Sequence, residues 1–135
     1  MSRSALDLDP DVRAMWLELE RRCVLVGIDL ELTQTYRTPA EQAALYAKGR
    51  TTPGLIVTHA PPGYSFHEFR RAFDVGIKAH PKDLTPKDWY DGPWGHIGEI
   101  GESCGLDWGG RWKRPDRPHF EHHGGRTLAQ WRALA

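Results

Sequence analysis

The stretch "GYSFHEFRRAFDVGI", residues 63–77, combines the pattern of a buried strand with two ionisable side chains, His67 and Asp74. Residues 71–77 alternate in a way that predicts a β-strand, because side chains two positions apart lie on the same face of a strand. One face is apolar and is expected to pack in the core; it carries Phe73, Val75 and Ile77. Asp74 belongs to the opposite face, so a carboxylate lies on a strand that should be buried.

The neighbours of Asp74 on its own face are small. Ala72 and Gly76 flank it, which leaves space above the carboxylate for a ligand or an ion. A buried carboxylate without a partner is costly, and we therefore expect Asp74 to lie beside a cation. The residues alone leave two interpretations open: an ion pair with an arginine such as Arg70 or Arg71, or a bound metal ion.

On both sides of this strand the sequence predicts a mixture of helices and strands. Helices are expected over residues 9–26, 38–49, 94–105 and 126–134, with Asp9, Thr38 and Thr127 as caps of three of them. Further strands are expected over residues 28–37, 106–112 and 117–123, and loops over residues 50–66 and 79–93. Because this order lacks the regular rhythm of parallel βαβ units, the expected fold class is α+β.

The bulk properties exclude several classes of function. Eighteen basic and eighteen acidic residues cancel in a chain of 135 residues, so there is no electrostatic footprint for nucleic acid. No apolar run is long enough to span a bilayer, and the first residues lack the apolar core of a secretory signal, so we expect synthesis in the cytoplasm and no membrane insertion. The length predicts one domain over residues 1–135, and we expect a monomer with Cys23 and Cys104 as free thiols rather than a disulfide.

A second group of polar residues lies in "DRPHFEH", residues 116–122. His119 and Glu121 point to one face of the expected short strand, and Phe120 packs on the other. Together with His67, this segment provides two histidines and a carboxylate. Catalytic zinc sites use such a set of three protein ligands and keep a fourth position for water. Asp116 lies three residues before His119 and is a candidate for the group that takes the proton of that water.

Several segments together resemble the VanY-like family of zinc D,D-carboxypeptidases and L-alanyl-D-glutamate peptidases. "SFHEFRRAFD", residues 65–74, is similar to the family signature S-x-H-x-x-G-x-A-x-D, with Ser65, His67, Ala72 and Asp74 at their positions. "DRPHFE", residues 116–121, resembles the second motif, and "YRTPAEQAALYAKGR", residues 36–50, resembles the segment in which an arginine precedes a helix. "VTHAPPGYSFH", residues 57–67, and "IGEIGESCGLDWGGRWK", residues 97–113, resemble single-domain phage endolysins of this family. The resemblance covers the chain from about Leu30 to its end.

This resemblance implies a fold and a set of roles. The fold would be a small antiparallel sheet beneath the metal with flanking helices, shared with hedgehog and lysostaphin-type domains. His67, Asp74 and His119 would hold one Zn²⁺ ion. Asp116 would be the general base and then the proton donor, and Arg37 would stabilise the oxyanion.

Contacts with substrate are expected from a further set of residues around these ligands. Ser65 would orient the loop or touch the substrate, while Trp108, Trp112 and Tyr36 are candidates for the walls of the cleft. Glu121 is expected to orient a zinc-binding histidine rather than to bind the metal. Arg70 occupies the position of the motif's glycine, and we expect it either to reshape the rim of the cleft or to bind an acidic group of the substrate.

The function that the resemblance implies is hydrolysis of the peptidoglycan stem peptide, most specifically of its L-alanyl-D-glutamate bond. The chain would act as a phage or prophage endolysin without a separate wall-binding domain, and another factor would release it to the periplasm. Two alternatives remain: a D-alanyl-D-alanine carboxypeptidase with the same zinc chemistry, and a zinc-containing wall-binding module without turnover.

Overall fold

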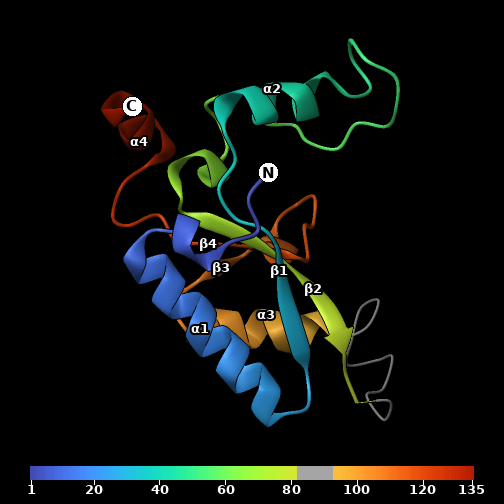
Figure 1. Cartoon of the computed structure of the whole chain (residues 1–135), viewed down its shortest axis with the longest axis vertical. Helices are drawn as coiled ribbons and strands as arrows, with labels where there is room; N and C mark the ends of the chain where they lie inside the picture. The colour runs from blue at the N-terminus through green and yellow to red at the C-terminus, as the bar shows by residue number, and fades with distance from the viewer. Residues whose placement is uncertain (82–92) are drawn as a thin grey trace.

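A four-stranded antiparallel sheet forms the centre of the computed structural model, which describes residues 1–81 and 93–135. The strands are β1 (Asp29–Gln34), β2 (Ala72–Ala79), β3 (Asp107–Trp108) and β4 (His119–Glu121), in the order β1-β2-β4-β3 (Figure 1). The α+β class and the antiparallel sheet expected from the sequence are confirmed. Most of the loop expected over residues 79–93 lies outside the described residues.

The register of the sheet separates an apolar row from a polar row. Phe73 of β2 pairs with Phe120 of β4, which in turn pairs with Trp108 of β3, and all three side chains are buried. One residue further along β2, Asp74 lies between Gln34 of β1 and His119 of β4. Because successive side chains on a strand point to opposite faces, this second row faces away from the core.

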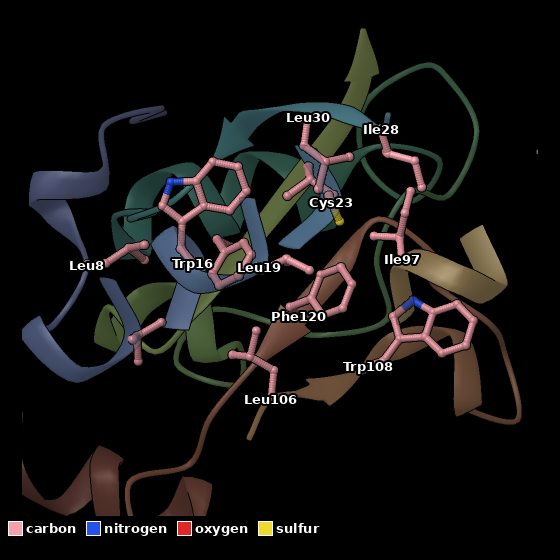
Figure 2. Packing of buried hydrophobic residues seen from close by; sticks show 13 residues of the cluster. Leu8, Trp16, Leu19, Cys23, Ile28, Leu30, Ile97, Leu106, Trp108 and Phe120 are labelled. Carbon is pink, nitrogen blue, oxygen red and sulfur yellow. The ribbon is translucent and has the colours of Figure 1, made fainter. Parts of the chain in front are cut away.

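Two helices cover the apolar face of the sheet. They are α1 (Pro10–Leu25) and α3 (Trp94–Ser103), which lie together on one side of the strands in Figure 1. Four apolar side chains of α1 are buried: Val12, Trp16, Leu19 and Cys23. Figure 2 shows Trp16, Leu19 and Cys23 in one cluster with Ile97 of α3 and with Phe120 and Trp108 of the sheet.

Two glycines let α3 approach the sheet closely. A Cβ atom at Gly98 would lie 2.2 Å from the Trp108 ring, and one at Gly101 would lie 2.3 Å from the Phe120 ring. Glycine disfavours an isolated helix, but here any side chain would collide with the core. The glycines that weaken the helical pattern of this segment are therefore required by its packing.

The remaining helices are short, and the two α-helices among them lie apart from the α1–α3 pair (Figure 1). They are α2 (Pro39–Ala47) and α4 (Leu128–Leu134), with the 3-10 helices η1 (Ala5–Asp7), η2 (Phe66–Phe69) and η3 (Gly109–Arg111). Thr38 and Thr127 cap α2 and α4 as predicted, each in a reciprocal capping box. No helix among residues 1–81 and 93–135 combines the length and apolar character that crossing a membrane requires.

Three local expectations need correction. Asp9 precedes α1 but does not cap it, because its carboxylate accepts a hydrogen bond from Arg71 Nη1 at 3.2 Å. The strand expected over residues 106–112 ends at Trp108, where η3 begins. Residues 66–69, which were expected to lie in the loop and in the connection to the following strand, form η2. Both cysteines are free, as expected.

Candidate metal centre and active site

The sheet and the segment before β2 bring His67, Asp74 and His119 together. One nitrogen of each histidine and one oxygen of Asp74 all lie within 4.8 Å of one another. His67 Nε2 is 3.3 Å from Asp74 Oδ1, and His119 Nδ1 is 3.1 Å from the same oxygen. Asp74 and His119 are paired across β2 and β4, so the register of the sheet fixes their separation.

The outer nitrogen of each histidine has a defined partner. His67 Nδ1 lies 2.8 Å from the carbonyl oxygen of Thr35, which can only accept, so this nitrogen donates. His119 Nε2 lies 2.7 Å from Glu121 Oε1. Although burial opposes it, hydrogen bonds from His119 and His123 hold the pKa of Glu121 below its ordinary value, so the carboxylate accepts. These contacts orient both rings, as the outer partners of metal-binding histidines do.

With these orientations, the inner nitrogens of both rings direct lone pairs at the carboxylate of Asp74. Three acceptor atoms cannot converge in a buried site without a cation between them. Burial disfavours the charged forms, but the ion-pair hydrogen bonds prevail: they hold the pKa of Asp74 below its ordinary value and raise that of His119 to about 10. The set of two imidazoles and one carboxylate fits Zn²⁺.

His67 is held by the short helix η2 and by the segment after β1. Ser65 Oγ accepts a hydrogen bond from the His67 backbone N–H, and Glu68 completes a capping box around this turn. The carbonyl oxygen of His67 accepts a hydrogen bond from the Arg37 backbone N–H at 3.1 Å. Residues 35–37 therefore hold both the ring and the backbone of His67 in place. The same contacts bring Arg37 close to the three candidate zinc ligands.

Arg37 is a buried cation without a carboxylate in direct contact. Its Nη1 donates to Gln42 Oε1 at 2.8 Å and its Nη2 donates to Gln34 Oε1, and it forms no ion pair within the described part of the chain. Burial lowers the pKa of Arg37, and the nearby charges of Asp74 and Glu68 oppose that effect. The two amide oxygens fix the plane of the guanidinium but leave its charge available to a ligand.

Asp116 lies at the exposed edge of the same site, ahead of β4. Its carboxylate is partly desolvated, which raises the pKa of Asp116, and the repulsion of Asp74 adds to this while His119 opposes it. A raised pKa makes a carboxylate a better proton acceptor. Its backbone is fixed by a hydrogen bond from its N–H to the Gly109 carbonyl oxygen at 2.9 Å.

These groups open into a common cavity of about 480 Å³. Its lining includes the three clustered residues, Arg37, Asp116, Ser65 and Glu121, together with Gln34, Tyr64 and Trp112. The structure thus gathers most of the residues singled out from the sequence. The sequence analysis missed Gln34 and Gln42, because their contacts with Arg37 depend on tertiary packing that the sequence pattern does not show.

Three candidates for substrate contact lie elsewhere, and these expectations are corrected. Trp108 is buried in the core, with its Nε1 donating to the Arg117 carbonyl oxygen at 2.8 Å, and Trp112 lines the cavity instead. The Arg70 guanidinium stacks over the Tyr36 ring at 4.1 Å and binds the Asp7 carbonyl oxygen at 3.1 Å. Neither Arg70 nor Tyr36 belongs to the lining of the cavity.

The backbone of Arg70 accounts for the glycine of the sequence signature. Its φ angle is +62°, in the left-handed region that glycine adopts without steric cost. The residue ends η2, and its own N–H donates to the Phe66 carbonyl oxygen. Glycine at this position of the signature is therefore explained by the conformation of the turn between His67 and Asp74, and not by close approach of the substrate.

Comparisons with known proteins agree with this geometry. The profile of a peptidase M15 family described as D-alanyl-D-alanine carboxypeptidase matches residues 58–122. The chain is 36% identical over 122 residues to the peptidoglycan L-alanyl-D-glutamate endopeptidase CwlK of Bacillus subtilis strain 168, covering 85% of this chain and 73% of CwlK.

Two solved structures share the fold. The L-Ala D-Glu endopeptidase ChiX of Serratia marcescens matches with a TM-score of 0.61 and 20% identity, over 97% of this chain and 91% of ChiX. The D,D-pentapeptidase VanY from the VanB-type vancomycin resistance cassette, an E175A mutant in complex with Zn(II), matches with a TM-score of 0.58 and 13% identity, over 92% of this chain and 83% of VanY.

Fold, ligand cluster and sequence similarity together define a zinc metallopeptidase. The chain belongs to the peptidase M15 family.

Proposed function

We propose that the chain is a zinc-dependent peptidase of the peptidoglycan stem peptide and that it cuts the bond between L-alanine and D-glutamate. The observation that carries this proposal is the convergence of His67, Asp74 and His119 in one cavity with Arg37 and Asp116. Support for the particular bond comes from the similarity to CwlK over most of both chains and from the fold shared with ChiX.

One zinc ion would be held by His67 Nε2, the Asp74 carboxylate and His119 Nδ1. When bound there, the ion supplies a Lewis acid that polarises the scissile carbonyl and makes water nucleophilic near neutral pH. The contacts of Thr35 with His67 and of Glu121 with His119 keep both imidazoles in the tautomer that can bind it.

Asp116 would move the protons. Its carboxylate borders the cavity beside the ligand cluster, where it accepts a proton from the attacking water and delivers it to the nitrogen of the leaving amine. The raised pKa of Asp116 favours both halves of this transfer, because the carboxylate accepts the proton readily and the carboxylic acid donates it to an amine that is far more basic.

Arg37 would stabilise the charge that develops on the carbonyl oxygen. The two glutamines position its guanidinium before the substrate arrives, so no reorganisation is needed during the reaction. Ser65 lines the cavity and supports the turn that carries His67, and a contact between its hydroxyl and the substrate is part of the same proposal.

The Arg37→Lys variant is expected to lower kcat by about 10²–10³, the usual effect of losing one preorganised oxyanion donor, with a smaller change in KM. Lysine keeps the charge but cannot contact Gln34 and Gln42 in one plane while facing the substrate. Steady-state kinetics on muropeptides measures the effect, and Arg3→Lys, an exposed arginine outside the cavity, is the matched control. An unchanged kcat in Arg37→Lys would remove Arg37 from the reaction.

A digest of purified sacculi followed by mass spectrometry tests the proposed bond. The expected products carry a new amino group on D-glutamate and a new carboxyl group on L-alanine. The D-alanyl-D-alanine carboxypeptidase activity is the second candidate, favoured by the description of the family that matches residues 58–122. Release of free terminal D-alanine without a new D-glutamate amine would identify that activity and contradict the first.

The biological setting is a further part of the proposal. We expect the protein to be a phage or prophage endolysin that another factor releases from the cytoplasm to peptidoglycan in the periplasm. Its support is the resemblance of residues 57–67 and 97–113 to endolysins.

A further inference from the structure

A second groove continues from the catalytic cavity on the side of Asp116. It has a volume of about 990 Å³ and shares part of its lining with the cavity, including Val57, Tyr64, Trp112 and Asp116. Its lining comes from two segments, residues 57–61 with Tyr64 and residues 112–116. The cavity and this groove are thus one continuous binding surface that is wider than the metal site.

The groove carries an excess of positive charge. Lys113 and Arg114 line it, and Asp116 is the sole carboxylate among the described residues of its lining. Both cations are exposed, and neither is paired with an acidic side chain in the part of the chain that the structure describes. By contrast, the neighbouring Arg111 is paired with Glu102 at 3.0 Å and does not line the groove. Two adjacent cations in the lining, without an acidic partner among the described residues, favour an anionic ligand.

The positions of Arg37 and Asp116 set the direction in which a substrate lies. Arg37 lines the catalytic cavity but not the groove, whereas Asp116 lines both. The group that donates a proton to the leaving amine must lie within about 2.6–3.2 Å of that nitrogen. The carbonyl half of the substrate therefore lies on the Arg37 side, and the amine half extends past Asp116 into the groove.

We propose that Lys113 and Arg114 form a subsite for the carboxylate of the residue that follows the scissile bond. This inference rests on the proposed function, in which that residue is D-glutamate with a free α-carboxylate beside the new amine. Trp112 and Tyr64 line both spaces, with 42% and 46% of their areas exposed. The subsite makes the peptidase selective for stem peptides whose glutamate is not amidated.

The test compares two stem peptides that differ only in a free or an amidated α-carboxyl group of D-glutamate. The protein is expected to have the lower KM for the free acid. The double variant Lys113→Gln/Arg114→Gln should raise KM for the acid about threefold to tenfold, the range for two partly exposed ion pairs, and leave the amide within about twofold. The difference between the two peptides should also shrink as ionic strength rises.

Arg111→Gln is the matched control, because it removes one adjacent positive charge from outside the groove. It is expected to keep the preference for the acid. Equal KM values for the two peptides in the unchanged protein would overturn the subsite, and so would an equal loss on both peptides in the double variant.

A binding experiment distinguishes failure of the subsite from failure of the proposed cleavage site. Titration of the Asp116→Asn variant with the two uncut peptides should show tighter binding of the acid, and this preference should disappear when Lys113 and Arg114 are also replaced. Preference for the acid in this variant, together with no cleavage between L-alanine and D-glutamate by the unchanged protein, would support the subsite and contradict the proposed bond. Equal binding of both peptides would overturn the subsite, whichever bond is cut.

Discussion

The Asp116→Asn variant is expected to retain the fold and one zinc ion per chain while its kcat falls by about 10²–10⁴, the usual contribution of a general acid–base. Asp116 is not one of the three clustered residues, and its side chain lies at the exposed edge of the cavity. Asparagine keeps the shape of the side chain but can neither accept the proton of water nor return it to the leaving amine. Metal analysis and kinetics on the same preparation measure the two properties together.

Two results would contradict this role. Loss of zinc in Asp116→Asn would make Asp116 part of the metal site, and an unchanged kcat would remove it from the reaction. The matched control is Asp107→Asn, an exposed aspartate that does not line the cavity. A binding module without turnover does not need a base at this position, so a large loss of hydrolysis also excludes that alternative.

The His119→Ala variant is expected to lose stoichiometric zinc and, with it, all measurable hydrolysis. Its Nδ1 faces Asp74 in the centre of the cluster, and alanine leaves two ligands where a catalytic zinc site uses three. The Glu121→Gln variant should produce a graded version of the same effect, about 10–100-fold weaker zinc binding, because it removes the anionic partner of His119 Nε2.

The control for these variants is His122→Ala, at the histidine that directly follows β4 in the sequence. Its ring contacts Arg71 rather than the metal cluster, so zinc binding should remain at one ion per chain. Competition with a chromophoric chelator measures the affinities. Full zinc binding by His119→Ala would show that the ion is held elsewhere.

The sequence predicted the polar row of the site because strand parity is a strong constraint. The alternation around Asp74 assigned its side chain to the face opposite Phe73, and the register pairs Asp74 with His119 and Phe73 with Phe120. Capping boxes are similarly local, and both Thr38 and Thr127 were predicted from a few neighbouring residues. Signals of this kind depend on the next two to four residues and need no knowledge of the tertiary structure.

Tertiary contacts account for what the sequence did not predict. Trp108 and Trp112 are both plausible cleft walls by composition, but η3 between them turns the first into the core and leaves the second at the cavity. Gln42 is recognisable as a site residue only when α2 packs beside Arg37, where its side chain also donates to the Ala60 carbonyl oxygen at 2.7 Å. Such contacts leave no periodic pattern in the sequence from which they could be predicted.

Arg70 shows how one substitution can be misread without a structure. In the sequence it stands at the glycine of the signature that residues 65–74 resemble, and a charged side chain near a cleft suggests contact with substrate. The structure instead explains the position by backbone conformation and places the guanidinium over Tyr36. The left-handed conformation costs about 1–2 kcal/mol for a residue with a Cβ, and the contacts with Tyr36 and Asp7 offset part of that cost.

The central claim is that a single zinc ion at His67, Asp74 and His119 carries the hydrolysis of peptidoglycan. Titration of the chelated protein with zinc, with bound metal and release of stem-peptide fragments followed in the same samples, tests it most directly. The predicted result is that both signals rise together and saturate at about one ion per chain, as expected for a three-ligand catalytic site. Undiminished hydrolysis in the fully chelated protein would contradict the claim.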